Sequence, residues 1–363
     1  MTGEGLNEDQ ECEAVKSNGV VELKMDRNWG LLKRKSQTKM RFRNLNDPLS
    51  NCLKRRAAKI LFYGLAFMSI FLVFLSSVFA ENINSRAAVV MDVLTGKMLY
   101  AKHPKRRLPP ASTTKLMTAI VTIEKADLDN VITISKNASL VRSLKAGFKQ
   151  GDKVTVEKLL YAALIKSAND AAVALAEAVA GSEKGFVELM NQKAISIGAR
   201  DTKFINSTGL PGPHQYTTAL DLSKIMSCVL SYHKLKEIIA TPAVELSTDK
   251  GEILSLKNTD KLLWSDGDLI GGKTGYTLRA GHCFVCAAER EKEVIIVALL
   301  GSSSREHLWK EAEALIDKGF QIIENKKRLQ SIHIQNGGQN KELSGSFGKY
   351  LINGRNRFWH PYI

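Results

Sequence analysis

Short apolar runs separated by turn residues mark both ends of the chain region that follows residue 80. Residues 86–104, RAAVVMDVLTGKMLYAKHP, contain two such runs around a Thr-Gly turn, and this pattern predicts a β-hairpin. Residues 282–291, HCFVCAAERE, and 292–302, KEVIIVALLGS, predict a second hairpin with a polar turn. Strands are therefore expected at the two ends of this region rather than in regular alternation with helices.

Helical periodicity fills the space between and after these hairpins. Apolar residues recur at helical spacing over 112–125, 156–181 and 218–233, and the break signal KSAND divides the second stretch into two helices. A closing helix with one apolar face is predicted over 306–323. This order predicts an α/β protein of the α+β kind. Its antiparallel sheet is built from both ends of the domain and flanked by helices, and a helical lobe comes from the middle.

One segment is hydrophobic throughout. Residues 60–80, ILFYGLAFMSIFLVFLSSVFA, carry no charge and have the ~20 residues that cross a bilayer as a helix. Basic residues lie just before it, so we expect 1–59 to be a disordered cytoplasmic leader and all that follows the segment to be outside. A Val-Phe-Ala end favours cleavage as a signal peptide, whereas the long apolar run favours a retained anchor. Both stay open, as does a translation start at Met40 instead of Met1.

Composition excludes little. The 363 residues are 44% hydrophobic and 25% charged, which indicates a globular chain, and the formal net charge is +15. A basic balance suits nucleic acid or any other polyanionic surface. The sequence shows no zinc-finger spacing, no basic-aromatic interleaving and no basic region leading into heptads, so no nucleic-acid partner is predicted.

The cysteines and histidines give no metal site. Cys283 and Cys286 form a C-x-x-C, a spacing used for metal or redox chemistry. They fall in a predicted strand, where residues three apart face opposite sides, so two ordinary half-buried cysteines are predicted. The seven histidines show no metal-ligand spacing, and we expect neither a metal nor a cofactor.

Three short motifs carry the candidate chemistry. Ser112-x-x-Lys115 alone is weak, because the same spacing occurs four more times, at Ser36, Ser231, Ser247 and Ser346. Ser112 alone would be read as a helix N-cap. Ser167-Ala-Asn169, at the predicted break between two helices, and Lys273-Thr-Gly275, which is expected to open a strand after a Gly-Gly pair, change that interpretation.

A serine hydroxyl is a poor nucleophile until a base takes its proton. A helix returns positions three apart to one face, so Lys115 is expected to reach the Ser112 hydroxyl. Burial near a second lysine, Lys273, disfavours two ammonium groups and is expected to bring the pKa of one of them toward neutrality. Lys115 is therefore predicted to be a buried general base.

The three motifs, in this order, resemble those of the penicillin-recognising serine enzymes, and the text around them resembles the low-molecular-mass D-alanyl-D-alanine carboxypeptidases. The similarity extends from about residue 86 to residue 320 and includes the runs LPPASTTKLMTA, IKSANDAAVALAE and GGKTGYTLRAGHCFVCAAER. It implies a β-lactamase/transpeptidase-like fold. It also implies a serine peptidase that removes the terminal D-alanine from peptidoglycan stem pentapeptides ending in D-Ala-D-Ala, and that β-lactam antibiotics inhibit.

The resemblance also implies a role for each motif residue. Ser112 would be the acyl-ester nucleophile and Lys115 its base. Ser167 would relay a proton to the departing amine, and Asn169 would hold the substrate amide. The remaining implied roles are binding of the terminal carboxylate by Lys273 and Thr274, room for an extended substrate at Gly275, and an oxyanion hole made by the backbone N–H groups of Ser112 and Tyr276.

One position departs from the pattern. Relatives often carry an arginine pair in the turn after the last hairpin, where it helps to bind the carboxylate. Here that turn reads GSSSREHLW, so Arg305 is the candidate for the first position, while Leu308 leaves the second without a charge.

Other functions remain open. A serine β-lactamase shares the three motifs, but a class A enzyme needs a glutamate between the second and third. No Glu occurs from residue 189 to 236, and the second motif is Ser-Ala-Asn. A DD-endopeptidase of the same family and a non-catalytic cell-wall scaffold are the further alternatives.

These inferences divide the chain into four parts. After the leader and the 60–80 segment, we expect a D-Ala-D-Ala carboxypeptidase domain over 81–323 and a polar tail over 324–363. The expected location is the cell membrane, with the catalytic domain on the extracytoplasmic side and no C-terminal anchor.

Overall fold

The computed structural model describes residues 59–64 and 83–339, with side chains up to residue 331. The chain divides into two units, Met1–Phe79 and Ala80–Ile363. In the first, only a short helical segment over 59–64 is described, so most of the predicted spanning segment and leader lie outside the described residues. No helix in the described part of the chain is long and apolar enough to span a membrane.

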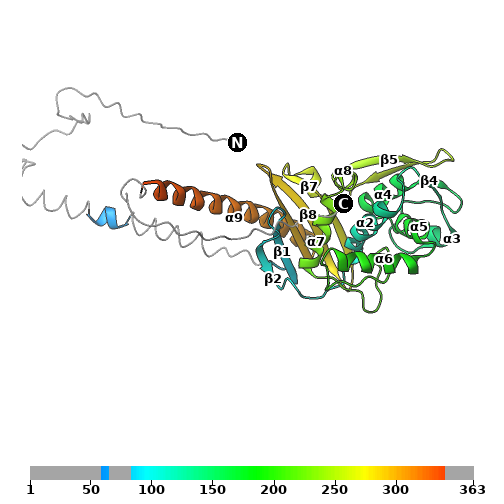
Figure 1. Cartoon of the computed structure of the whole chain (residues 1–363), viewed down its shortest axis with the longest axis horizontal. Coiled ribbons are helices and arrows are strands. Elements are labelled where there is room, and N and C mark those ends of the chain that lie inside the picture. The colour runs from blue at the N-terminus through cyan, green and yellow to red at the C-terminus, as the bar shows by residue number, and fades with distance from the viewer. Residues whose placement is uncertain (1–58, 65–82, 340–363) are drawn as a thin grey trace, which may run out of the picture. The chain divides into compact units, whose positions relative to one another are not determined.

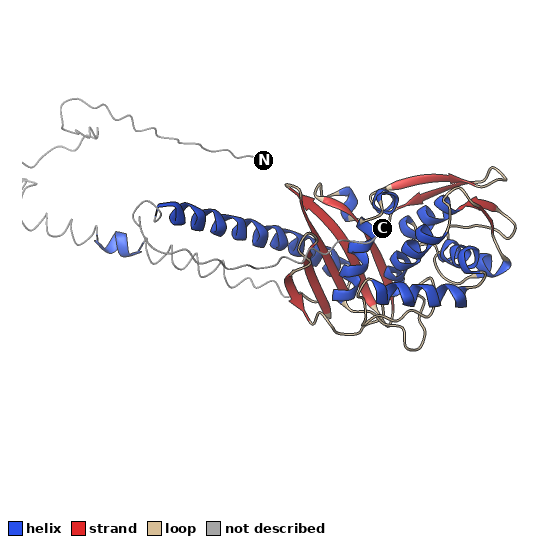
Figure 2. Cartoon of the chain, viewed as in Figure 1, coloured by secondary structure: helices blue, strands red, loops and turns tan. Residues whose placement is uncertain are grey.

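The second unit is built on one five-stranded antiparallel sheet, in the order β2-β1-β9-β8-β7. Its strands are β1 (Ala87–Asp92), β2 (Met98–Lys102), β7 (Leu269–Thr277), β8 (Gly281–Arg290) and β9 (Glu293–Ser302). Strands β1 and β9 pair along their lengths, with Val89 opposite Ala298. The predicted sheet from both ends of the domain is confirmed, and so are both hairpins. Figure 2 shows this sheet as one layer with helices on both sides.

Both faces of the sheet are buried, and side chains alternate between two cores. On β8, Cys283 and Val285 face the core beneath the helical lobe, whereas Phe284 and Cys286 face the core beneath the last helix. The two cysteines therefore lie on opposite faces, as predicted, and cannot share a metal ion. The expectation that they are half-buried is wrong, because each is completely buried between the sheet and a helical layer.

Helix α9 (Arg305–Gln339) covers one face of the sheet (Figure 1). Its apolar stripe packs there through Leu308, Ala312, Leu315, Ile316 and Phe320. At Gly319 the helix comes so close that a Cβ atom would lie 2.7 Å from Ile295 Cδ1. The helix ends at Gln339 rather than at the predicted residue 323, so the first part of the predicted polar tail is helical. The rest of that tail, 340–363, lies outside the described residues.

The helical lobe covers the other face. Its larger helices are α2 (Lys115–Lys125), α4 (Val156–Ile165), α5 (Asn169–Ala180), α6 (Glu183–Ser196), α7 (Ala219–Leu230) and α8 (His233–Ile239). The predicted break between α4 and α5 is confirmed. Helix α5 ends as expected at Gly181, which takes a left-handed conformation with φ +70°.

Several elements escaped the sequence pattern. They are α6, α8, the short helix α3 (Lys136–Leu140), the 3-10 turn η2 (Leu262–Trp264) and the pairs β3 (Val131–Thr133) with β4 (Lys153–Thr155) and β5 (Ala243–Ser247) with β6 (Ile253–Lys257). Helix α6 buries only Phe186, Met190 and Ala194, one residue per turn. A stripe that narrow gives little periodic signal. The paired strands of three and five residues are too short for alternation to be distinctive.

Candidate active site

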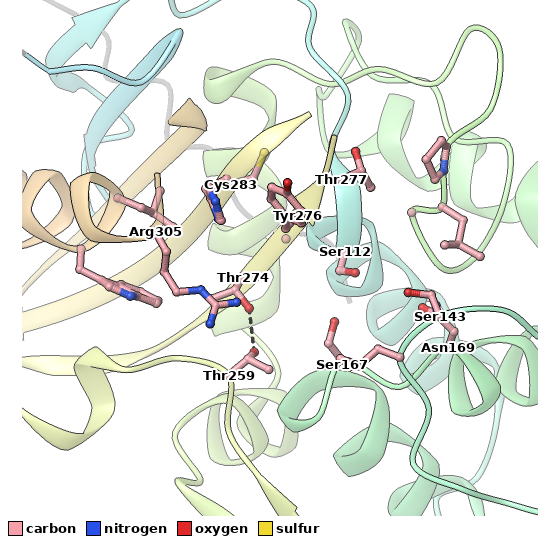
Figure 3. A pocket seen from close by; sticks show the side chains of 18 residues that line it. Ser112, Ser143, Ser167, Asn169, Thr259, Thr274, Tyr276, Thr277, Cys283 and Arg305 are labelled. Atoms are coloured by element: carbon pink, nitrogen blue, oxygen red, sulfur yellow. Dashed lines mark hydrogen bonds between the residues drawn. The ribbon is translucent and has the colours of Figure 1, made fainter. Parts of the chain in front are cut away.

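A pocket of about 440 Å3 opens between strand β7 and the helical lobe (Figure 3). Its walls carry seven of the nine residues that the sequence predicts: Ser112, Ser167, Asn169, Thr274, Gly275, Tyr276 and Arg305. The other two, Lys115 and Lys273, have no exposed surface, but their amino groups hydrogen bond to pocket hydroxyls. The structure thus brings all three motifs together, although they are spread over more than 160 residues of sequence.

Ser112 lies in a 3-10 turn, η1 (Ala111–Thr114), that leads directly into α2. It is therefore neither on the α-helix nor its N-cap, a position held by Thr114. The turn is strained, because Ala111 has φ +49° in a region that favours glycine. Gly209, from the opposite loop, holds it in place: a Cβ there would lie 1.8 Å from the Ala111 carbonyl oxygen. This packing presents the half-buried Ser112 hydroxyl to the pocket.

Lys115 has three hydrogen-bonding partners in the site. Its Nζ lies 3.2 Å from Ser112 Oγ and donates to Asn169 Oδ1 and to the Thr208 carbonyl oxygen, each at 2.7 Å. Complete burial and repulsion by Lys273 lower the pKa of Lys115 well below its ordinary value, against an opposing attraction from Asp170. A neutral amine has two N–H bonds and one lone pair. The two strong acceptors occupy both N–H bonds, so the lone pair is left for the Ser112 hydroxyl.

Ser167 sits at the break between α4 and α5 with φ +64°, a second strained residue at the site. Lys273 Nζ donates to Ser167 Oγ at 2.9 Å and to the Thr274 carbonyl oxygen at 3.1 Å. Burial lowers the pKa of Lys273 to about 7, and the charge of Asp260 opposes that change. The Ser167 hydroxyl is therefore hydrogen bonded to Lys273, as the Ser112 hydroxyl is to Lys115.

Asn169 and Asp170, at the start of α5, attach the loop over residues 141–148 to the site. Asn169 Nδ2 donates to the Arg142 carbonyl oxygen at 3.0 Å, and its backbone N–H donates to that of Leu144 at 2.8 Å. The buried Asp170 carboxylate accepts the backbone N–H groups of residues 146, 147 and 148 at 2.9–3.2 Å. Since Ser143 and Leu144 line the pocket, Asp170 is a structural anchor for one of its walls.

Strand β7 forms the opposite wall. It begins at Leu269, so the prediction that the strand opens after the Gly-Gly pair is wrong, and that pair lies within the strand. A Cβ on Gly275 would lie 2.8 Å from the backbone nitrogen of Ser112, so glycine lets the strand approach the η1 turn. The Thr274 hydroxyl donates to Thr259 Oγ1 at 2.7 Å. Tyr276 is half exposed and stacks on His282, with ring centroids 4.4 Å apart.

Arg305, at the first residue of α9, lines the same pocket, and its side chain points toward Thr274 (Figure 3). Leu308 reaches the pocket wall with only 2% of its surface exposed, so that position offers an apolar contact. His282 lines the same side of the pocket. Burial and the charge of Arg305 lower the pKa of His282.

Sequence reasoning missed several residues that complete the site. Thr208 and Gly209 hold the Lys115 and Ser112 ends, Asp170 anchors a wall, and Thr259 and Asp260 lie behind Thr274 and Lys273. Asp170 follows the second motif directly and could have been noted for that reason. The others come from loops with no periodic or motif signal.

The family of the chain follows from its sequence match over these elements. Residues 75–304 match the Peptidase_S11 family of D-alanyl-D-alanine carboxypeptidases. The chain belongs to this family. Eight of the nine predicted site residues, all except Arg305, lie within the matched range.

Relatives and solved structures agree with that assignment. The chain is 31% identical to D-alanyl-D-alanine carboxypeptidase DacF of Bacillus subtilis over 256 residues, which make up 68% of this chain and 66% of that protein. It is 34% identical to a D-alanyl-D-alanine endopeptidase of Pseudomonas aeruginosa, over 56% of this chain and 67% of that one. The crystal structure of the Streptomyces K15 DD-transpeptidase is similar over 66% of this chain and 98% of its own, with 33% identity and a TM-score of 0.63. The penicillin-binding fold predicted from the motifs is confirmed. The chain spans just under two thirds of the Bacillus relative.

Proposed function

We propose that the chain is a serine-type D-Ala-D-Ala carboxypeptidase that removes the terminal D-alanine from peptidoglycan stem peptides. One observation carries the proposal: Lys115 Nζ lies 3.2 Å from Ser112 Oγ while two acceptors hold its N–H bonds. That arrangement suits a neutral amine that accepts a proton, and burial lowers the pKa of Lys115 in the same direction. Membership of a peptidase family supports the same chemistry.

In the proposed acylation, Ser112 Oγ attacks the carbonyl carbon of the penultimate D-alanine while its proton passes to Lys115 Nζ. The carbonyl oxygen takes the negative charge, for which the backbone N–H groups of Ser112 and Tyr276 are the proposed donors. When the C–N bond breaks, the amine of D-alanine leaves with a proton supplied through the Ser167 hydroxyl. Water then attacks the ester carbon and releases Ser112.

The terminal carboxylate of the substrate has a matching wall. Lys273, Thr274 and Arg305 lie on the β7 side, and none of the pocket residues is an aspartate or glutamate. A carboxylate there is attracted by cations and meets no facing acid at the pocket wall. The Asn169 side chain is the proposed contact for the substrate amide. Its Oδ1 also accepts a hydrogen bond from Lys115 Nζ.

Intact-mass spectrometry after penicillin treatment tests the nucleophile. We expect one adduct on the wild type and none on Ser112→Ala. Ser247→Ala is the matched control, because Ser247 has the same S-x-x-K spacing on an exposed strand, and it should acylate as the wild type does. An adduct that persists in Ser112→Ala would overturn the assignment.

The two enzymatic alternatives are separated by turnover. No glutamate is among the residues that line the pocket, so the protein should hydrolyse penicillin slowly while it releases D-alanine from D-Ala-D-Ala peptides over many turnovers. Rapid nitrocefin hydrolysis without D-alanine release would favour the β-lactamase. Cleavage of cross-linked stem dimers faster than of free pentapeptides would favour the endopeptidase, the activity named for the Pseudomonas relative.

We also propose that residues 60–80 attach the protein to the cell membrane, with the catalytic unit on the extracytoplasmic side. The support is the uncharged ~20-residue run and the basic residues before it. Peptidoglycan as substrate requires the same placement.

A further inference from the structure

Four ionisable side chains without any exposed surface surround the two serines: Lys115, Lys273, Asp170 and Asp260. Burying a charge is costly unless an opposite charge and hydrogen bonds compensate for it. The mechanism above uses both lysines and gives no task to either acid. Each aspartate attracts one lysine: Asp170 raises the pKa of Lys115, and Asp260 raises that of Lys273.

The two acids differ in their hydrogen bonds. The oxygens of Asp170 accept three backbone N–H groups of the 141–148 loop, so this carboxylate is stabilised as an anion and its anchoring role accounts for it. Asp260 Oδ1 accepts the Leu262 N–H at 3.0 Å, and the neighbouring Leu263 N–H also lowers the pKa of this carboxyl. Asp260 Oδ2 is buried and has no hydrogen-bond partner among the residues that the structure describes. A buried carboxylate oxygen without a hydrogen bond costs free energy, so a purely structural role does not explain why an aspartate occupies this position.

The position of Asp260 connects it to the pocket. It directly follows Thr259, whose hydroxyl accepts the hydrogen bond of Thr274 and whose backbone N–H donates to the Ile165 carbonyl oxygen. The Asp260 backbone N–H donates to Asn258 Oδ1 at 2.9 Å, so the turn that carries the carboxylate is fixed from both sides. Asp260 therefore stands behind the wall that is proposed to bind the substrate carboxylate.

The charges around this pair are few. Lys273 is repelled by Lys115 on α2 and attracted by Asp260, and its hydrogen bonds go to Ser167 and Thr274, so the attraction to Asp260 acts through space. Asp260 also faces Asp266 in the loop before β7, and the Cys286 thiol of β8 lies within its field. Burial raises the pKa of Asp260 to about 7, despite the lowering effects of the Leu262 N–H, of Lys273 and of the Leu263 N–H. Asp260 is the only attractive charge that acts on Lys273 in the described part of the chain.

We infer that Asp260 is a positioning residue whose buried negative charge raises the share of Lys273 that carries its proton near neutral pH in the free enzyme, and so maintains the wall that receives the substrate carboxylate. The inference rests on the proposed function. Without that charge, Lys273 would be a neutral amine next to Lys115, and it would attract a carboxylate less strongly and polarise Ser167 less. The effect is on the charge of another residue, not on the substrate directly.

Asp260→Asn tests the inference in the full-length protein. The amide keeps the Oδ1 acceptor for Leu262 and nearly the same volume, while the charge is lost. The pH dependence of kcat/KM reports the groups of the free enzyme. We expect its alkaline limb, measured as D-alanine release from a D-Ala-D-Ala peptide, to move to lower pH by about one unit in Asp260→Asn. The loss at pH 8 should lie mainly in KM, and at pH 6 the variant should approach the wild type.

Asp221→Asn is the matched control. Asp221 is also buried, accepts the Asp201 backbone N–H and the Thr202 hydroxyl, and is not among the residues that line the pocket. It should alter thermal stability without moving the alkaline limb. An Asp260→Asn profile that is uniformly lowered, or identical to the wild type, would overturn the inference. A wild type that releases no D-alanine at any pH would instead overturn the proposed function.

Discussion

Lys115 and Lys273 lie in one site, but we propose the first as a base and the second as a cation. Their hydrogen bonds explain the difference. Lys115 Nζ meets two strong acceptors and the Ser112 hydroxyl, which leaves a neutral amine with its lone pair toward the nucleophile. Lys273 Nζ meets one hydroxyl and one carbonyl oxygen and has a buried carboxylate nearby. The first environment suits a base and the second a cation, although burial lowers the pKa of both.

Arginine substitutions should therefore separate them. A guanidinium does not give up its proton in the working pH range. Lys115→Arg should lower the penicillin acylation rate by about 10² to 10⁴, the usual contribution of a general base. Lys273→Arg keeps the cation and should retain measurable acylation. Stopped-flow or quench-flow acylation rates, together with melting temperatures to exclude unfolding, check this. Equal acylation by Lys115→Arg and the wild type would contradict the assignment of the base.

At the scale of elements, the site depends on the contact between strand β7 and the η1 turn. The strand can approach because residue 275 has no side chain, and the turn is held from the other side by Gly209. The sequence motif Lys-Thr-Gly predicted room for a substrate at this glycine. The structure shows that the η1 turn is also close to this glycine. A Cβ on Gly275 would clash with the backbone nitrogen of Ser112 and with Ala111 Cβ.

Gly275→Ala should push these two elements apart. The added Cβ would lie 2.8 Å from Ser112 N and 3.0 Å from Ala111 Cβ, and such overpacking costs about 1–3 kcal/mol. We expect a lower melting temperature and a slower acylation of Ser112. Gly267→Ala is the control, because a Cβ there meets nothing within 4 Å. Unchanged acylation in Gly275→Ala would show that the turn can give way without loss of geometry.

At the scale of the whole molecule, the buried lysines make folding depend on pH. The pKa of Lys273 is about 7 in the folded chain and near 10.5 when exposed, so between these values unfolding takes up a proton. The cost of burying this lysine is greatest below pH 7 and is relieved as the pH rises. Lys115 acts in the same direction.

The free energy of unfolding should accordingly rise with pH between about 7 and 10, more steeply in the wild type than in Lys273→Met. The difference in slope should approach about 1.4 kcal/mol per pH unit, the value for one proton. Urea unfolding at pH 7.5, 8.5 and 9.5 measures it. Parallel slopes for the two proteins would mean that Lys273 stays charged in the folded chain.

The membrane proposal is also tested on the whole protein. With the 60–80 segment retained, the protein should sediment with membranes, and protease added to cells stripped of their outer layers should digest the catalytic unit. Fractionation followed by N-terminal sequencing checks both points. A soluble protein that begins at Glu81 would show that the segment is cleaved. A catalytic unit that stays protected would contradict the extracytoplasmic placement.

The sequence by itself determined the strongly periodic elements and the chemistry of the motifs. The hairpins and the amphipathic face of α9 follow from local patterns, because each buries apolar residues that recur with a regular spacing in the sequence. The α4–α5 break follows from the residues KSAND, which interrupt that spacing. The pairing of Ser112 with Lys115 follows from their spacing of three. Even the opposite faces of Cys283 and Cys286 follow from the pleat of a strand.

Only the tertiary structure decided what surrounds those motifs. Asp260, Thr259 and Gly209 lie in loops, where no hydrophobic periodicity predicts which distant residues they will contact. The strain at Ala111 and Ser167 exists because packing from other elements holds it, and no local sequence would favour it. The charge of a buried lysine likewise depends on every group brought near it by folding. Local physics thus set the Ser112–Lys115 pair that we propose as nucleophile and base, and long-range packing set the environment of that pair and the wall that faces it.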